Sequence, residues 1–194
     1  MEINESGLSF RFPSETAIKF DDTRFYRENF NCLPGAKGVD ILYNDSHWFV
    51  LLEIKNCLDK EDENRWRIAP NNQKKHLAPE NIKGRESLDI EVAQKVAMTI
   101  ACLNGATTFG ELRQTTQPLL SFANALYTEE FSKHNKKMLV ILFLEGQFGS
   151  QARTKKMIMT KLQQSLRKKL AWLNCTVSVV DSSTYNQNIF MLAE

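Results

Sequence analysis

The chain has 194 residues, of which 42% are hydrophobic and 25% are charged, and its formal net charge is +2. A chain of this length fits one domain with its own core, and so small a net charge does not by itself predict a polyanionic partner. The longest apolar runs are too short to span a bilayer, and the start MEINESG lacks the layout of a signal peptide. We therefore expect a cytoplasmic protein without a membrane partner.

The cysteines and histidines show no spacing typical of metal ligands. The four cysteines lie far apart without a Cys-x-x-Cys pair, so neither a zinc knuckle nor a disulfide framework is indicated, and buried thiols are favoured. These residues are Cys32, Cys57, Cys102 and Cys175, and the histidines are His47, His76 and His134. We expect none of the histidines to be catalytic.

The N-terminal part of the sequence predicts an irregular or strand-like segment over residues 1–13, followed by a helix. Ser14 can cap a helix that runs to Phe30, and Asp21 and Asp22 are the point where it could break in two. Residues 38–56 then predict two short strands joined by a tight turn with Asp45-Ser46 at its tip. The second strand is apolar on both faces, as in the centre of an α/β sheet whose two faces are covered.

Three charged residues converge in this hairpin. With the turn at Asp45-Ser46, Asp40 lies opposite Leu51 and is a diagonal neighbour of Glu53, with Cα atoms roughly 7 to 8 Å apart. Because side chains alternate along a strand, Lys55 shares the face of Glu53. Uncompensated charge at a buried sheet costs several kcal/mol, and a divalent cation between the carboxylates would remove that cost.

Residues 57–86 form a long polar stretch without periodicity, which we interpret as an insertion within a single domain. Cations and an aromatic residue alternate in it, as on surfaces that bind nucleic acid. These residues are Arg65, Trp66, Arg67, Lys74 and Lys75. A solvated loop of mixed charge is the alternative.

The remainder of the chain predicts helices that alternate with buried strands. The expected elements are a helix over 89–103 ended by Asn104-Gly105, a helix over 117–131 within a helical insertion at 111–136, a strand over 138–144, a helix over 151–173, and a strand over 176–180. The last two strands are expected to be parallel because a helix connects them. The apolar residues 189–192 suggest a docking tail.

The helix expected over 151–173 is amphipathic. Its apolar stripe consists of Ile158, Leu162, Leu166, Leu170 and Leu173. Its other side is basic and includes Arg167, together with Arg153 and Lys156 near its start. This side could contact nucleic acid or could simply be a solvated face.

The order of elements, with Gly-Val-Asp in one strand and Glu-Ile-Lys at the end of the next, resembles the PD-(D/E)xK nuclease superfamily. The resemblance covers residues 14–180 without the insertions. It implies an α/β, restriction-endonuclease-like fold with a central mixed β-sheet flanked by helices. The triplet Glu53-Ile54-Lys55 carries little weight alone, and its phase relative to Asp40 carries most. The family's proline before the aspartate is replaced by Val39.

The resemblance also implies roles for individual residues. Asp40 and Glu53 would bind Mg²⁺ or Mn²⁺ together with the carbonyl of Ile54, and Lys55 would orient the attacking water and offset negative charge.

Two further positions are implied less directly. An acid from the first helix would join the site, and Glu28 and Glu15 are the candidates. A polar residue of the helix after the catalytic strand would also lie near it, with Gln94 favoured over its neighbour Lys95.

We therefore expect a Mg²⁺- or Mn²⁺-dependent endonuclease or exonuclease that hydrolyses phosphodiester bonds, with DNA as the favoured substrate and a homodimer or partner protein as an open option. The first alternative is a catalytically inactive protein of the same fold that binds nucleic acid or a protein partner. In that case Asp40, Glu53 and Lys55 would be a relic or a structural ion pair. The second alternative is an unrelated α/β protein whose partner docks on the charged insertion.

Overall fold

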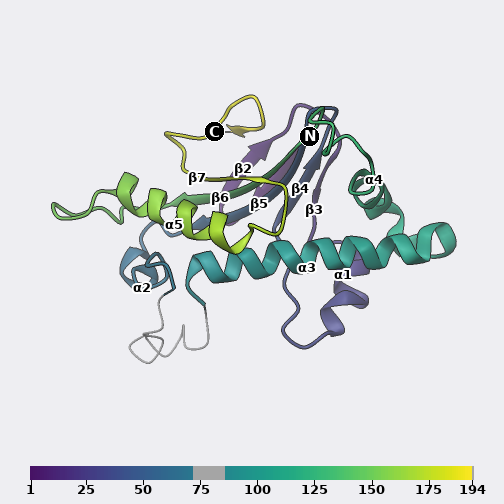
Figure 1. Ribbon diagram of the computed structural model, residues 1–194. Coiled ribbons are helices and arrows are strands. Elements are labelled where there is room, and N and C mark those ends of the chain that lie inside the picture. The colour runs from purple at the N-terminus through teal and green to yellow at the C-terminus, as the bar shows by residue number, and fades with distance from the viewer. Residues whose placement is uncertain (72–85, 194) are drawn as a thin grey trace.

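The computed structural model describes residues 1–71 and 86–193 (Figure 1). Its main element is a mixed five-stranded sheet of order β3-β4-β5-β6-β7. The strands are β3 (Ala17–Lys19), β4 (Ile41–Asn44), β5 (Trp48–Asn56), β6 (Lys137–Glu145) and β7 (Thr176–Val180). β3, β4 and β5 pair antiparallel, whereas β5, β6 and β7 pair parallel. The expected strands over 138–144 and 176–180, and their parallel pairing, are confirmed.

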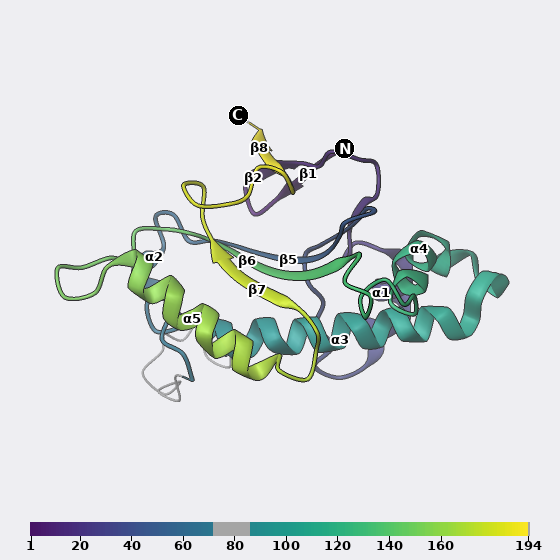
Figure 2. The same ribbon diagram turned by 45° about the horizontal axis from the view of Figure 1, so that its top comes forward.

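Helices cover one face of this sheet, and a small second sheet covers the other (Figure 2). The helices are α1 (Arg24–Glu28), α2 (Glu61–Asn64), α3 (Leu88–Phe109), α4 (Gln117–Ala125) and α5 (Lys155–Lys169), with 3₁₀ turns at Phe30–Cys32, Gly110–Leu112 and Gln114–Thr116. The small sheet has the order β1-β2-β8, formed by β1 (Glu2–Glu5), β2 (Leu8–Arg11) and β8 (Met191–Ala193).

β5 is buried on both faces because two separate hydrophobic cores flank it. Phe49 and Leu51 belong to the core shared with α3, α4 and α5. Val50 and Leu52 belong to the core shared with β1, β2 and the C-terminal segment. The continuous apolar run of this strand, and the layered α/β class that it predicted, are therefore confirmed.

The helix expected between Ser14 and Phe30 is wrong in its first half. Residues 17–19 form β3, which pairs with β4, so the backbone groups at that edge of the hairpin are satisfied by a strand. α1 starts only after Asp21 and Asp22 and contains five residues, so these two residues separate a strand from a helix and not two helical pieces. A strand pairing between distant segments has overridden local helix propensity here.

Two other helix ends differ from expectation. α3 runs through Asn104-Gly105 to Phe109, because Leu103 and Ala106 are fully buried on its core face. α4 ends at Ala125.

At the C-terminal end of the chain, α5 is bounded at Lys155 and Lys169, and its predicted apolar stripe is buried at Ile158, Leu162 and Leu166. The docking tail is confirmed, since Ile189 and Phe190 are buried and β8 pairs with β2. Among the described residues, no helix combines the length and the apolarity needed to cross a bilayer.

Candidate functional site

The β4–β5 register places Asp40 directly across from Glu53. The observed pairs run from Ile41↔Leu52 to Asn44↔Phe49, and extending them by one residue brings Asp40 opposite Glu53. The expected pairing of Asp40 with Leu51 is therefore wrong by two residues. Because the side-chain period of a strand is two, this shift leaves Asp40 on the face of Glu53.

The turn itself explains the shift. The carboxylate of Asp45 accepts hydrogen bonds from the backbone N–H groups of His47 and Trp48 at 2.7 and 2.6 Å. The N–H of Asp45 donates to the carbonyl of Trp48 at 2.9 Å. Ser46 and His47 therefore form the tip, one residue later than expected, as in turns where an aspartate bonds the backbone that follows it.

Asp40 is anchored to the neighbouring segments on both sides. Its Oδ2 accepts a hydrogen bond from the N–H of Ile54 at 2.7 Å, and its carbonyl accepts one from Phe20 at 2.8 Å. Asp40 is 6% exposed. Since the N–H and C=O of one residue in a strand point to the same neighbour, the carbonyl of Ile54 also faces the side on which Asp40 lies.

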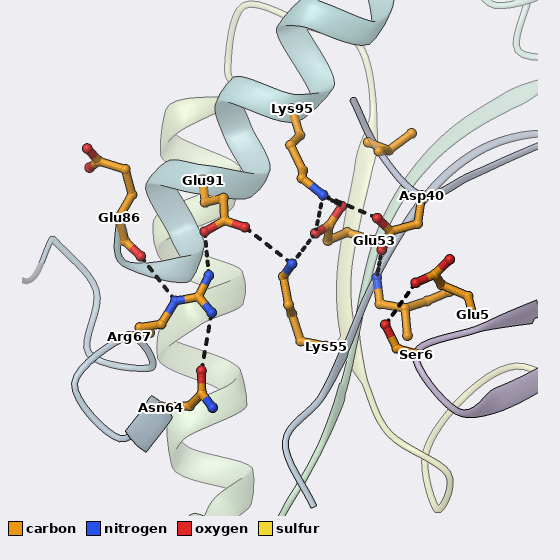
Figure 3. Close-up of polar contacts among 12 residues, drawn as sticks. Glu5, Ser6, Asp40, Glu53, Lys55, Asn64, Arg67, Glu86, Glu91 and Lys95 are labelled. Atoms are coloured by element: carbon orange, nitrogen blue, oxygen red, sulfur yellow. Dashed lines mark hydrogen bonds and ion pairs between the residues drawn. The ribbon is translucent and has the colours of Figure 1, made fainter. Parts of the chain in front are cut away.

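Lys95 of α3 joins the two carboxylates. Its Nζ lies 3.2 Å from Oδ1 of Asp40 and 2.7 and 2.8 Å from Oε1 and Oε2 of Glu53 (Figure 3). Nζ of Lys55 lies 2.7 Å from Oε1 of Glu53, which has no exposed surface. Two ammonium groups therefore balance two carboxylates that are almost completely withdrawn from water.

The ion pairs continue from this centre into the insertion. Lys55 also lies 3.2 Å from Oε1 of Glu91, and Oε2 of Glu91 pairs with the guanidinium of Arg67 (Figure 3). Arg67 donates from Nη1 to Oδ1 of Asn64 at 3.2 Å and from Nε to the carbonyl of Glu86 at 3.4 Å. An alternating chain of acids and bases thus links β5, α3 and the polar insertion.

Burial and these charges act against one another on the ionisable groups. Complete burial raises the pKa of Glu53 to about 7, although the positive charges of Lys55 and Lys95 oppose the rise. Burial disfavours the ammonium of Lys95, but the carboxylates of Glu53 and Asp40 outweigh it and hold its pKa above the ordinary value. Lys95 therefore stays charged at neutral pH.

Asp21 is a further acid near the site that the sequence did not reveal. It follows Phe20, whose N–H reaches Asp40, and its Oδ1 is buried without a hydrogen-bond partner among the described residues. Burial raises the pKa of Asp21 to about 6, and the negative charges of Asp40 and Glu5 add to the rise. The sequence marked Asp21 only as a helix break, because its position beside Asp40 depends on the β3–β4 pairing.

The polar position on α3 was assigned to the wrong neighbour. Lys95 reaches the carboxylates, whereas the carbonyl oxygen of the Gln94 side chain accepts a hydrogen bond from Lys37 at 2.7 Å in an exposed pair. Successive residues of a helix point about 100° apart, so only one of the two can face the sheet.

Neither candidate acid from the N-terminal segment belongs to the chain of ion pairs. Glu28 lies 2.8 Å from Nε of Arg24 on the exposed side of α1. The Glu15 side chain is 89% exposed and lies 3.5 Å from the N-terminal amine of Met1.

The residues expected to contact nucleic acid divide into three groups. Arg67 is 4% exposed and paired with Glu91, so its assignment to a surface is wrong. Arg65, Arg153, Lys156 and Arg167 are exposed, as expected. Lys74 and Lys75 lie outside the described residues.

The oxygen donors suit a hard divalent cation, and the ammonium of Lys95 stands where such a cation would lie between Asp40 and Glu53. In the part of the chain that the structure describes, no group of three or more His, Cys, Asp or Glu side chains is arranged to hold a metal ion. Cation binding would therefore require Lys95 to move away from the carboxylates.

Comparison with known proteins gives a family but no activity. No curated protein and no solved structure matches the chain. A family model described as a family of unknown function, DUF6661, matches residues 23–194, which include Asp40, Glu53, Lys55 and Lys95. The chain therefore belongs to the DUF6661 family.

Proposed function

We propose that this protein is a metal-dependent nuclease that hydrolyses phosphodiester bonds in DNA, with a restriction-endonuclease-like fold. The observation that carries the proposal is the position of Asp40 and Glu53, which lie opposite one another, are buried, and are bridged by a single cationic group at 2.7 to 3.2 Å. Buried carboxylates arranged around one cation, beside further titratable groups with shifted pKa values, are typical of catalytic centres.

Mg²⁺ or Mn²⁺ fits the donor groups at this centre. Asp40 and Glu53 would supply carboxylate oxygens, and the carbonyl of Ile54 faces the same side. Oδ1 of Asp21, which has no hydrogen-bond partner within residues 1–71 and 86–193, is a fourth candidate donor, and a nearby cation would relieve the repulsion between Asp21 and Asp40. A cation held there would act as a Lewis acid toward the phosphate oxygens.

The lysine of the motif is held in a fixed position. Glu53 and Glu91 hold Nζ of Lys55 at 2.7 and 3.2 Å. From this position the ammonium would orient the attacking water and offset the negative charge that develops on the phosphate.

The substrate assignment rests on the exposed basic side of α5. Lys156 and Arg167 lie on the helix and Arg153 precedes it, and all three side chains are exposed. Affinity for DNA should therefore fall with salt, and removing one phosphate contact should reduce the slope of log K against log salt concentration by roughly 0.9.

The test is cleavage of single- and double-stranded DNA in Mg²⁺ and in Mn²⁺. Asp40→Asn, Glu53→Gln and Lys55→Met should each abolish cleavage and leave the fold intact by circular dichroism, and Asp21→Asn should weaken it. Asp181→Asn is the control, because Asp181 is a similarly buried acid whose ion pair is with Lys155 and not with Lys55 or Lys95. Wild-type protein that cleaves neither DNA nor RNA, or full activity in the Asp40 variant, would refute the proposal.

The position of Lys95 also favours one competing function. A lysine that neutralises both carboxylates is the arrangement expected of a catalytically inactive nuclease fold, in which an ion pair has replaced the metal. Such a protein would bind nucleic acid or a protein partner. It should show no Mn²⁺ binding in calorimetry that depends on Asp40, with or without DNA.

A further inference from the structure

Lys95 and Lys55 are held by different groups, although both bind Glu53. Lys55 has a second acid, Glu91, at 3.2 Å. The ion pairs of Lys95 among the described residues are with Glu53 and Asp40, the same carboxylates that would bind a metal. A cation that takes these two carboxylates therefore removes the partners of Lys95 but leaves Glu91 to Lys55.

The charge balance decides when such an exchange is favourable. When both are ionised, Asp40 and Glu53 carry two negative charges, and Lys55 and Lys95 carry two positive charges within 3.2 Å of them. Asp40 is 6% exposed and Glu53 has no exposed surface, so water screens these charges poorly. A divalent cation would leave an excess of two positive charges. Withdrawal of one ammonium removes one of them, and arrival of one singly charged phosphodiester removes the other.

Lys95 is the ammonium that is free to withdraw. Its side chain extends from α3 and not from the sheet, so it can turn outward without a change in the sheet. Exposure does not separate the two lysines, since the side chains of Lys95 and Lys55 are 15% and 20% exposed, and the difference lies in their partners. Lys55, in contrast, is tied through Glu91 to the buried guanidinium of Arg67. Withdrawal of Lys95 would uncover both carboxylates at once.

We propose that Lys95 competes with the divalent cation for Asp40 and Glu53. Lys95 leaves the two carboxylates when a phosphate anion binds and its negative charge compensates the positive charge of the cation. This inference rests on the proposed function, because it concerns the same carboxylates. It makes metal and phosphodiester binding cooperative, so the protein without substrate holds little metal. By thermodynamic reciprocity, each ligand raises the affinity for the other by the same factor.

The first test is titration of the protein with MnCl₂ in the absence of nucleic acid. Lys95→Met keeps an unbranched side chain but removes the charge, and it should bind Mn²⁺ roughly tenfold or more tightly than the wild type. Without Mn²⁺ this variant should melt at a lower temperature, because Asp40 and Glu53 are left to repel one another. Mn²⁺ should raise its melting temperature more than that of the wild type.

Two variants control this measurement. Lys169→Met removes a lysine that lies 2.8 Å from another buried carboxylate, Asp89, and it should leave Mn²⁺ affinity unchanged. Lys95→Arg keeps the positive charge and should also show no gain. Adding Glu53→Gln to Lys95→Met should abolish the gain, which assigns the bound ion to this site.

The second test adds dimethyl phosphate, the smallest phosphodiester, to the same titration. It should tighten Mn²⁺ binding to the wild type, and the effect should be smaller in Lys95→Met, where no ammonium has to be displaced. Equal effects in the two proteins, or none in either, would overturn the coupling to phosphate.

The outcomes separate this inference from the nuclease assignment. If Lys95→Met gains Mn²⁺ affinity but the wild type cleaves no nucleic acid, the exchange holds and the nuclease assignment fails. If the wild type cleaves DNA and binds Mn²⁺ as tightly as Lys95→Met, the exchange is wrong and the nuclease assignment holds. Should Lys95→Met not fold with or without Mn²⁺, Lys95→Gln is measured in its place, and the same criteria apply.

Discussion

The hydroxyl of Thr99 accepts a hydrogen bond from the N–H of Val39 at 3.0 Å, and both residues are completely buried. Val39 immediately precedes Asp40, and Thr99 lies one helical turn after Lys95 on α3. This contact therefore helps to position the segment before β4, which carries one carboxylate, relative to the helix that carries its partner Lys95.

Thr99→Val should destabilise the protein by about 1 to 3 kcal/mol, because the buried N–H of Val39 loses its acceptor while the shape of the side chain is kept. Chemical denaturation measures this free energy of unfolding. Thr107→Val is the control, since the Thr107 hydroxyl donates to the carbonyl of Leu103 within the same helix. Its effect should stay within about 0.5 kcal/mol, and equal losses in the two variants would contradict the role given to Thr99.

Gly38→Ala should disturb the approach of the chain to Asp40. A Cβ at this position would lie 2.6 and 2.7 Å from two ring carbons of Phe20, which is fully buried and cannot easily move away. Overpacking of this kind costs about 1 to 3 kcal/mol, and the displaced strand should reduce any activity that depends on Asp40. Calorimetric melting and the cleavage assay measure the two effects.

Gly105→Ala provides the opposite case in the same protein. A Cβ at Gly105 would meet no atom within 4 Å, and the residue lies inside α3. Alanine should therefore stabilise the helix by about 0.5 to 1 kcal/mol. A rise in melting temperature for Gly38→Ala, or a clear fall for Gly105→Ala, would show that the packing around these residues is not as described.

Arg67→Met and Arg65→Met should differ strongly although the two residues are neighbours in sequence. The Arg67 side chain is 5% exposed and binds Glu91, Asn64 and the Glu86 carbonyl, so its loss should cost about 3 to 5 kcal/mol. The Arg65 side chain is 55% exposed and pairs with Asp62 on the surface, so its loss should cost less than about 1 kcal/mol. Unfolding in urea compares them directly, and similar costs would contradict the buried position of Arg67.

Asp181→Asn should destabilise the protein at neutral pH but not in acid. Burial alone would raise the pKa of Asp181, yet Lys155 at 2.6 Å and the hydroxyls of Thr184 and Ser183 lower it from 3.8 to about 2. Because the pKa in the folded state is the lower one, this stabilisation is present above pH 3.8 and is lost as the pH falls through about 2.

The cost of Asp181→Asn at neutral pH should be about 1 kcal/mol once solvent screening is allowed for, and it should shrink below about pH 3. Urea midpoints at the two pH values measure the change. Asp62→Asn serves as the control, since the Asp62 side chain is 95% exposed. Its effect on the free energy of unfolding should be small at both pH values. A cost for Asp181→Asn that grows on acidification would contradict the assigned ion pair.

The sequence by itself determined the layered fold and the common face of Asp40 and Glu53. Apolar runs of six or more residues, such as that of β6, have to be covered on both faces, and the spacing of apolar residues in α5 identifies its buried side. Moving a two-residue turn by one position along this hairpin shifts the pairing of the two strands by two residues. Asp40 and Glu53 therefore share a face even though the turn lies one residue later than expected.

Only the tertiary structure decided which other residues reach that face. Lys95 is 55 residues from Asp40 in the chain, and Asp21 approaches Asp40 through the pairing of a strand that resembled a helix. Arg67 looked like a surface cation because a local pattern of charges does not show which of them is buried. Such contacts join segments far apart in the sequence, so they depend on how helices and strands pack, and no periodicity within one segment contains that information.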